Sequence, residues 1–384
     1  PSLLACTTSL TRAPGDLRWL PMKRRRFLKT AGLLLTGGLA TGAGAVTVAR
    51  NRNSYYGGPI SDHFDGLNFF NPEGKPPKGF VELLKWQLGN GKKKWPAQYP
   101  SPFSDKPPAT TQGADLRVSF VGHATVLLQI AGKNILTDPV WSERCSPVTW
   151  AGPKRVNAPG IDFDDLPKID TVLLSHNHYD HLDLITLSKL RRRDNPLIIT
   201  PLGNDRILKD HDSLFQIAVG DWHDRIDLTP DFQITLEPMH HWSARGMGDR
   251  RNALWAAFVL QTPAGQIYHV GDTGFHDGIN YQAVRKKYGS FRLAILPFGA
   301  FEPRDFMRYQ HQNPDEAVRG HKLCGAQHTL GHHWGTFPLT NESIEDQLEA
   351  LDLARQDHGI SEHIFRALQP GQVWNVPVHP STEA

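Results

Sequence analysis

Cysteine is scarce in this chain of 384 residues, which contains only Cys6, Cys145 and Cys324. Since none of them stands in a Cys-x-x-Cys arrangement, the sequence argues against a thiolate zinc knuckle and against a disulfide scaffold. A chain of this length has no need of a disulfide to stabilise its fold. We therefore expect Cys145 and Cys324 to be buried as small apolar side chains.

Excess positive charge is absent from most of the chain, although the formal net charge is +3. Residues 1–50 carry eight Lys and Arg against the single acid Asp16, a balance of +7, so residues 51–384 sum to about −4. Nucleic-acid binding requires a basic surface that neutralises phosphates. We therefore expect no nucleic-acid partner. The 19 histidines point instead to metal binding, because imidazole is the commonest metal ligand.

The basic N-terminal residues precede an uncharged stretch. Met22 is the first methionine, and the basic run that follows it leads into residues 31–49, which carry no charge. Residues 22–49 resemble a twin-arginine export signal, with Arg24-Arg25-x-Phe27-Leu28-Lys29 as its core. We interpret residues 1–21 as upstream sequence translated from a misplaced start. The resemblance predicts a periplasmic protein, or an inner-membrane-associated one if the stretch is not cleaved; a chance basic start, and hence a cytoplasmic protein, stays open.

From residue 115 onwards, short apolar runs alternate with turn residues. Many runs are continuous, as in strands that are covered on both faces. We expect strands over 116–121, 125–130, 134–137, 171–175, 197–200, 234–236, 256–261, 266–270 and 293–296, and helices over 183–193, 279–287, 314–322 and 341–355. Asn341 is the expected start of the last helix. This pattern predicts a layered α/β domain over 115–384, preceded over 50–114 by an extended arm with one helix near 80–88.

The strongest chemical signal is the segment 175–183, which reads SHNHYDHLD. His176, His178, Asp180 and His181 follow an apolar run and precede an expected helix, which places them in a turn at the carboxyl end of a strand. Zinc accepts imidazole nitrogen and carboxylate oxygen at about 2.0–2.2 Å, so such a turn can bind two ions side by side. Without a metal, these groups would be buried unsatisfied or left without purpose.

Three other strand ends carry side chains of the same kind. They are His240-His241-Trp242, Asp272 within Gly271-Asp272-Thr273-Gly274, and His332-His333-Trp334. Each alone is a weak signal, because an aspartate beside glycine is often only a turn residue. Together they complete two metal sites with one aspartate between them.

These motifs resemble the metallo-β-lactamase superfamily and, within it, the N-acylphosphatidylethanolamine-hydrolysing phospholipase D family, over nearly all of residues 115–340. The resemblance implies a four-layer αββα sandwich. The blocks that carry the phospholipase likeness, beside the histidine motifs, are Val121-Gly122-His123-Ala124-Thr125, Leu136-Thr137-Asp138-Pro139, Ser146-Pro147 with Gly152-Pro153-Lys154-Arg155, Gly299-Ala300-Phe301-Glu302-Pro303-Arg304, Tyr309-Gln310-His311 and His333-Trp334-Gly335-Thr336-Phe337.

The resemblance implies a role for each site residue. The implied ligands are His176, His178 and His241 for a first zinc ion, Asp180, His181 and His333 for a second, and Asp272 as the bridge between them. His241 and His333 are preferred to His240 and His332 because the family's ligands directly precede Trp. His311 matches a position near the reacting phosphate, so Asp180, Asp272 and His311 are the expected catalytic residues.

Two further residues are expected to lie near the ligands. His123 is explained equally well as support for a ligand and as an ordinary core histidine. Asp138, at the end of a strand, is expected to hydrogen-bond backbone or a ligand histidine.

The resemblance implies a phosphodiesterase of the phospholipase D type, which cleaves lipids such as N-acylphosphatidylethanolamine with a hydroxide bridging two zinc ions. The expected partners are a phospholipid or another small anionic ester, and a membrane surface. The same metals also serve a lactonase of sugar phosphates or acyl lactones, a β-lactamase and, less in keeping with the acidic body, a nuclease of the RNase Z kind. A di-iron redox protein, which the nitrogen-rich ligand set disfavours, and a non-catalytic membrane-associated binding protein are the alternatives outside hydrolysis.

Overall fold

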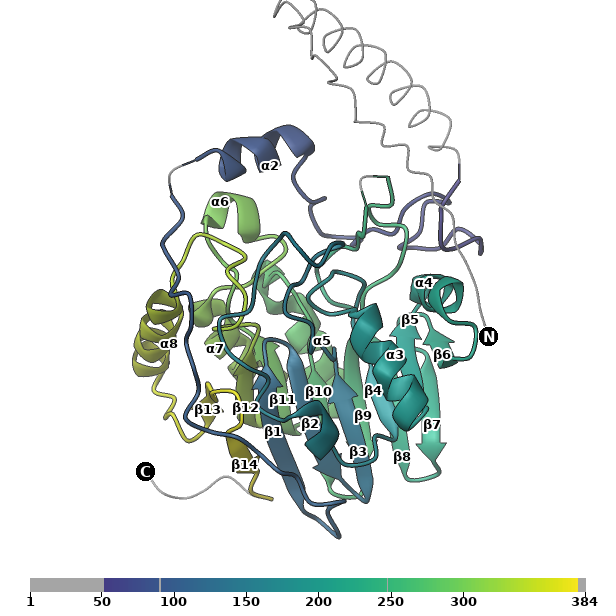
Figure 1. The fold of residues 1–384 in the computed structure, drawn as a ribbon, viewed down its shortest axis with the longest axis vertical. Coiled ribbons are helices and arrows are strands. Elements are labelled where there is room, and N and C mark those ends of the chain that lie inside the picture. The colour runs from purple at the N-terminus through teal and green to yellow at the C-terminus, as the bar shows by residue number, and fades with distance from the viewer. Residues whose placement is uncertain (1–51, 90, 247, 379–384) are drawn as a thin grey trace, which may run out of the picture. The chain divides into compact units, whose positions relative to one another are not determined.

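Two seven-stranded sheets packed face to face form the body of this protein in the computed structural model, which describes residues 52–89, 91–246 and 248–378 (Figure 1). Residues 52–384 form one unit. The predicted upstream segment 1–21 and the export-signal segment 22–49 lie outside the described residues.

The first sheet combines an antiparallel hairpin region with a parallel region. Its strands, in spatial order, are β14 (Val373–Asn375), β1 (Leu116–Gly122), β2 (Thr125–Ile130), β3 (Lys133–Thr137), β4 (Thr171–Leu173), β5 (Leu197–Pro201) and β6 (Gln216–Gly220). Strands β14 to β3 pair antiparallel, and β3 to β6 pair parallel.

The second sheet has the same mixed character. Its strands, in spatial order, are β13 (Phe365–Arg366), β12 (Ala326–His332), β11 (Phe291–Pro297), β10 (Gly265–His269), β9 (Ala257–Thr262), β8 (Phe232–Glu237) and β7 (Arg225–Thr229). Strands β10 to β13 pair parallel, and β7 to β10 pair antiparallel. The carboxyl ends of the parallel strands in each sheet therefore share one edge, where the loops are long enough to carry a site.

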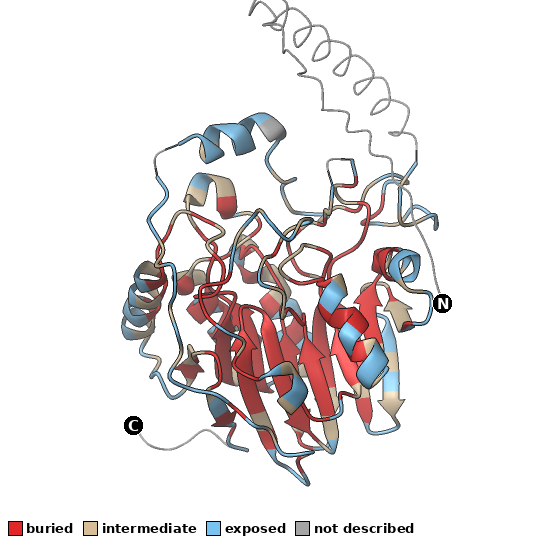
Figure 2. Cartoon of the chain, in the orientation of Figure 1, coloured by how far each residue is buried: buried red, intermediate tan, exposed pale blue. Residues whose placement is uncertain are grey.

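Helices cover the outer faces of both sheets. They are α3 (Leu184–Arg193), α4 (Asn204–His211), α5 (Ile279–Tyr288), α7 (Pro314–Cys324) and α8 (Ile344–His358). The short helix α6 (Arg304–Met307) lies above the sheets, and the 3-10 turns η1 (Phe163–Asp165) and η2 (His276–Gly278) lie in connections between strands and helices (Figure 1). Buried residues form one cluster between the sheets, including Phe120 and Phe258, and further clusters under the helices (Figure 2). This arrangement confirms the predicted αββα sandwich. None of the described helices combines the length and the apolarity that crossing a bilayer requires.

Most of the expected elements lie within two residues of their predicted bounds, but the predicted start of the last helix is wrong. Ser343 caps α8, because its hydroxyl accepts a hydrogen bond from the backbone N–H of Asp346 while the Asp346 carboxylate accepts one from the N–H of Ser343. The Asn341 side chain instead accepts a hydrogen bond from the Trp86 indole. Cys145 and Cys324 are buried and unpaired, as predicted.

The strands that the sequence did not predict lie at or beside the sheet edges. Strands β6 and β7 are partly exposed, and β13 and β14 contain two and three residues. Because a half-exposed edge strand needs no continuous apolar run, it leaves a weak pattern in the sequence.

The predicted arm, described over residues 52–89 and 91–114, crosses the body before β1. It contributes Phe64 and Phe69 to the core beneath the second sheet, and its helix α2 (Phe80–Gln87) stands away from the sandwich above α6 (Figure 1).

Candidate metal centre

The seven predicted ligands meet at the shared edge of the two sheets, although they come from four separate loops. The loop after β4 carries the 176–181 motif, and the loops after β8, β10 and β12 carry His241, Asp272 and His333. All of these loops follow strands that run towards the same edge, so the chain's direction in the sheets brings the side chains together.

The first group of candidate ligands consists of His176, His178, His241 and Asp272, whose ligand atoms lie within 4.8 Å of one another. His178 Nδ1 is 2.9 Å from His176 Nε2 and 3.2 Å from His241 Nε2. Asp272 Oδ2 is 3.9 Å from His176 Nε2 and 3.7 Å from His241 Nε2. A tetrahedral zinc ion with ligands at about 2.0–2.1 Å separates neighbouring ligand atoms by about 3.4 Å. The spacing of this group therefore fits such an ion.

A second group lies on the other side of Asp272 and contains His123, Asp180, His181 and His333. Asp272 Oδ2 is 3.2 Å from His181 Nε2 and 3.1 Å from His333 Nε2. Asp180 Oδ2 is 3.6 Å and 3.3 Å from the same two nitrogens. The Oδ2 atom of Asp272 thus faces both groups, which is the position that a bridging ligand requires.

Several buried polar atoms in this cluster lack a hydrogen-bond partner. They include His178 Nε2, His181 Nε2, Asp272 Oδ1 and His311 Nδ1. Buried polar atoms are rarely left unpaired in folded proteins, so the orphaned donor set fits a centre that holds cations.

The charge states favour metal binding as well. Burial lowers the pKa of His176 and His241 well below the ordinary value and that of His178 to about 4, so these imidazoles are neutral, as ligands must be. Burial also opposes protonation of His333, but Asp272 and Asp180 outweigh it and raise the His333 pKa to about 9. Asp272 and Asp180 thus favour a positive charge on His333, at the place where a bound metal cation would neutralise the two carboxylates.

Asp138 orients the second group from behind. Its carboxylate accepts hydrogen bonds from the Ser175 backbone N–H at 2.7 Å, from the Ser175 hydroxyl at 2.7 Å and from His181 Nδ1 at 2.8 Å. Because Nδ1 of His181 donates to Asp138, Nε2 is the ring atom turned towards the cluster and available to a metal ion. This geometry confirms the prediction for Asp138 and gives the Ser175 hydroxyl a partner other than a substrate.

The two explanations of His123 that the sequence left open are separated by the structure. His123 Nε2 lies 2.9 Å from Asp180 Oδ2, and its ring centroid is 4.1 Å from that of His333. His123 is therefore in direct contact with two candidate ligands and supports them.

Neighbouring histidines are kept out of the cluster. His240 Nδ1 lies 3.0 Å from the amide nitrogen of Asn280, and its ring faces that of His276. His332 Nε2 donates a hydrogen bond to the Val270 carbonyl at 2.7 Å. The structure thus brings together His241 and His333, the members of each pair that precede tryptophan.

His311 lies where the cluster approaches solvent. Its Nδ1 is 3.9 Å from Asp272 Oδ2, and its side chain is 14% exposed, close to the 13% of Asp180. Burial lowers its pKa to about 3, so the ring is neutral and can donate or accept one hydrogen bond. Asp180 and His311 therefore mark the open side of the site.

Two residues that sequence reasoning missed hold the ligand loops in place. Arg245 donates hydrogen bonds to the carbonyls of Asn177 at 3.0 Å and Leu182 at 2.9 Å, which lie at the two ends of the histidine motif. Asn71 of the arm donates to the His241 carbonyl at 3.0 Å and accepts from the Trp255 indole at 2.9 Å. No local sequence pattern marks either residue, because each acts on a segment far along the chain.

Comparison with known proteins agrees with this geometry. Residues 133–334 match the family model described as the beta-lactamase superfamily domain. The chain is 36% identical over 272 residues to N-acyl-phosphatidylethanolamine-hydrolyzing phospholipase D 1 of Caenorhabditis elegans, covering 67% of this chain and 75% of that protein. It is 24% identical to a UPF0173 metal-dependent hydrolase of Caldivirga maquilingensis, and the match covers 68% of this chain and 98% of that protein.

Solved structures share the fold. The isothiocyanate hydrolase from Delia radicum gut bacteria superposes with a TM-score of 0.54 at 21% identity, over 67% of this chain and 98% of that one. The sandwich, the candidate metal groups and these relatives agree: the chain belongs to the beta-lactamase superfamily, as a metal-dependent hydrolase with the metallo-β-lactamase fold.

Proposed function

We propose that this protein is a two-zinc phosphodiesterase of the phospholipase D type that acts on a phospholipid such as N-acylphosphatidylethanolamine. The observation that carries the proposal is the position of Asp272, whose Oδ2 lies 3.1–3.9 Å from nitrogens of both ligand groups. Five histidines and two carboxylates suit zinc better than they suit the harder cations, which prefer all-oxygen sites. The lipid class is supported by relatives in Caenorhabditis elegans and Saccharomyces cerevisiae that are named for this hydrolysis.

The two ligand groups would hold a pair of zinc ions, which would supply a water of lowered pKa and a Lewis acid for the phosphoryl oxygens. Asp272 lies between the two ligand groups and faces both. Asp138 holds the ligand His181 by a hydrogen bond, and His123 holds the ligand Asp180 in the same way. On the open side, the unpartnered His311 Nδ1 is placed to orient the phosphate or to hydrogen-bond the leaving oxygen. No protein nucleophile is needed.

Neighbouring histidines offer a matched test of this assignment. His241→Ala removes a proposed ligand, whereas His240→Ala removes a neighbouring buried imidazole that lies outside the cluster. We expect His241→Ala to lose metal and phosphodiesterase activity and His240→Ala to retain both. The assays are metal content per chain and product identification by mass after incubation with mixed phospholipids and lactones. Full metal and full turnover in His241→Ala contradict the proposed centre, and turnover of lactones alone contradicts the phosphodiester substrate.

A further inference from the structure

Helix α2 presents an apolar stripe to solvent. Val81, Leu84 and Leu88 are 59%, 47% and 76% exposed, and they follow one another at the spacing of a helix face. At about 100° per residue, this face lies opposite Trp86. Trp86 attaches the helix to the body, since its ring stacks on Phe306 at 5.1 Å and its indole N–H donates to Asn341. The stripe therefore points away from the protein, and Figure 2 shows the exposed helix standing clear of it.

Helix α2 lies within a segment, residues 75–94, that is rich in positive charge, whereas the rest of the body is acidic. Residues 75–94 contain six exposed lysines against the single acid Glu82. Among the described residues, only Lys93 of these six forms an ion pair, with Asp346 at 2.6 Å. An apolar stripe flanked by unpaired lysines is the composition of a helix that lies in the interface of an anionic bilayer.

The lysine-rich segment, residues 75–94, is fixed beside the opening of the metal centre. At its start, the Gln310 side chain donates to the Lys75 carbonyl at 3.2 Å, and the Gln310 carbonyl lies 3.0 Å from Nδ1 of the ligand His241. Arg250 donates to the Lys78 carbonyl and lies over the ring of Trp242, which in turn packs against His178. The residues just before α2 are thus connected to the proposed ligands by two contacts from Lys75 and by three from Lys78.

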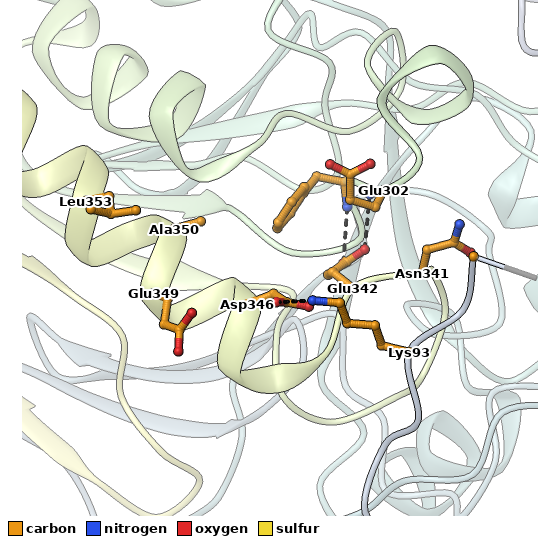
Figure 3. A pocket seen from close by; sticks show the side chains of 10 residues that line it. Lys93, Glu302, Asn341, Glu342, Asp346, Glu349, Ala350 and Leu353 are labelled. Atoms are coloured by element: carbon orange, nitrogen blue, oxygen red, sulfur yellow. Dashed lines mark hydrogen bonds and ion pairs between the residues drawn. The ribbon is translucent and has the colours of Figure 1, made fainter.

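The far end of the segment is tied to α8. Lys93 reaches across a cavity of about 490 Å³ to Asp346, and Glu302, Glu342 and Glu349 also line that cavity (Figure 3). Acidic side chains lie on the inner side of the segment, so an anionic surface has no electrostatic reason to approach there. The five unpaired lysines of the segment are exposed and attract such a surface, whereas Lys93 is paired with Asp346.

From the stripe, the charge and the attachments together, we propose that residues 75–94 form a docking surface for anionic phospholipid bilayers. Val81, Leu84 and Leu88 enter the interface, and the lysines contact lipid phosphates. The segment lies outside residues 133–334, which match the superfamily domain, so the hydrolase fold itself does not account for it. The proposal rests on the proposed lipid substrate for its purpose, but docking can be measured without turnover.

The test is co-sedimentation of the full chain with vesicles of phosphatidylcholine and with equimolar phosphatidylglycerol and phosphatidylcholine, neither of which contains an N-acylated lipid. We expect binding to the anionic vesicles that weakens as salt is raised. The variant Val81→Ser/Leu84→Ser/Leu88→Ser is expected to bind more weakly by at least a factor of about ten. The variant Lys78→Gln/Lys85→Gln/Lys94→Gln is expected to lose roughly fivefold for each lysine.

Matched controls replace exposed residues elsewhere on the body. Leu214→Ser/Val378→Ser and Lys168→Gln/Lys286→Gln/Lys322→Gln are expected to bind as the unaltered chain does. Turnover of the soluble ester bis(p-nitrophenyl) phosphate is expected to be unchanged in every variant, so loss of docking is distinguished from loss of the metal centre.

Three results would overturn the docking proposal. They are absence of binding to anionic vesicles at low salt, equal binding by the α2 variants and their controls, and a dimer in lipid-free sedimentation that the serine variant converts to a monomer. The last result would identify the stripe as a subunit interface.

Discussion

Replacing Asp138 by asparagine tests whether a residue that is not a proposed ligand controls the metal centre. The Asp138 carboxylate is completely buried and accepts three hydrogen bonds, two from Ser175 and one from His181 Nδ1. Asparagine keeps the shape but removes the charge and turns an NH2 group towards a donor. Hydrogen bonds to a charged group contribute about 1.5–3 kcal/mol each, so the loss of one or more predicts about 2–4 kcal/mol of lost stability.

The effect on metal affinity is the more specific expectation. Without the carboxylate, His181 is no longer held with its Nε2 towards Asp180 and Asp272. Removal of such an outer partner typically weakens metal binding by about 10–100-fold, or about 1.4–2.7 kcal/mol. The assays are competition of zinc between the protein and a chelator, and urea unfolding with and without metal.

Asp105→Asn is the matched control. Asp105 is also a buried aspartate that accepts from a charged group, Arg117, and from a serine hydroxyl, that of Ser119, but none of its partners is a proposed ligand. It should lose stability and keep its metal affinity. If Asp138→Asn bound zinc as tightly as the unaltered chain, the reasoning about the orientation of His181 would be refuted.

Three further predictions follow from contacts around the site. Arg245→Lys is expected to lose at least one of its two hydrogen bonds to carbonyl groups and to weaken metal binding about tenfold. Competition with a chelator measures the metal affinity, and an unchanged affinity would contradict the prediction. Burial lowers the pKa of His63, but hydrogen bonds to the two carboxylates on either side of its ring raise it above the ordinary value. His63→Gln should therefore lose most stability below about pH 6.5, and its difference in unfolding free energy from the unaltered chain should shrink as pH rises through the raised pKa. Urea unfolding at acid and alkaline pH measures this difference. A Cβ at Gly299 would lie 2.1 Å from the His333 carbonyl oxygen, so Gly299→Ala should destabilise the fold by several kcal/mol and reduce metal content. Gly335→Ala is the control: its φ is +64° and nothing lies within 4 Å of the added Cβ, so it should cost only about 1–2 kcal/mol. Equal effects of the two substitutions in thermal unfolding would contradict the clash.

Local sequence patterns are sufficient where a single segment decides the outcome. The 176–181 motif places four chemical groups in one turn, and continuous apolar runs such as 125–130 become strands covered on both faces. The tryptophan that follows each histidine pair, taken with the family resemblance, distinguished His241 from His240. The export signal over 22–49 stays a prediction, because it lies outside the described residues.

The sequence by itself thus determined the fold class and the kinds of side chain available for a metal centre, since periodicity and strand-end residues are local properties. Only the tertiary structure decided how Asp138 and His123 support the ligands, how Arg245 and Asn71 hold their loops, and which face of α2 stays exposed. Each of these depends on contacts between segments tens to hundreds of residues apart. The packing of the two sheets creates those contacts, and no pattern within one segment encodes them.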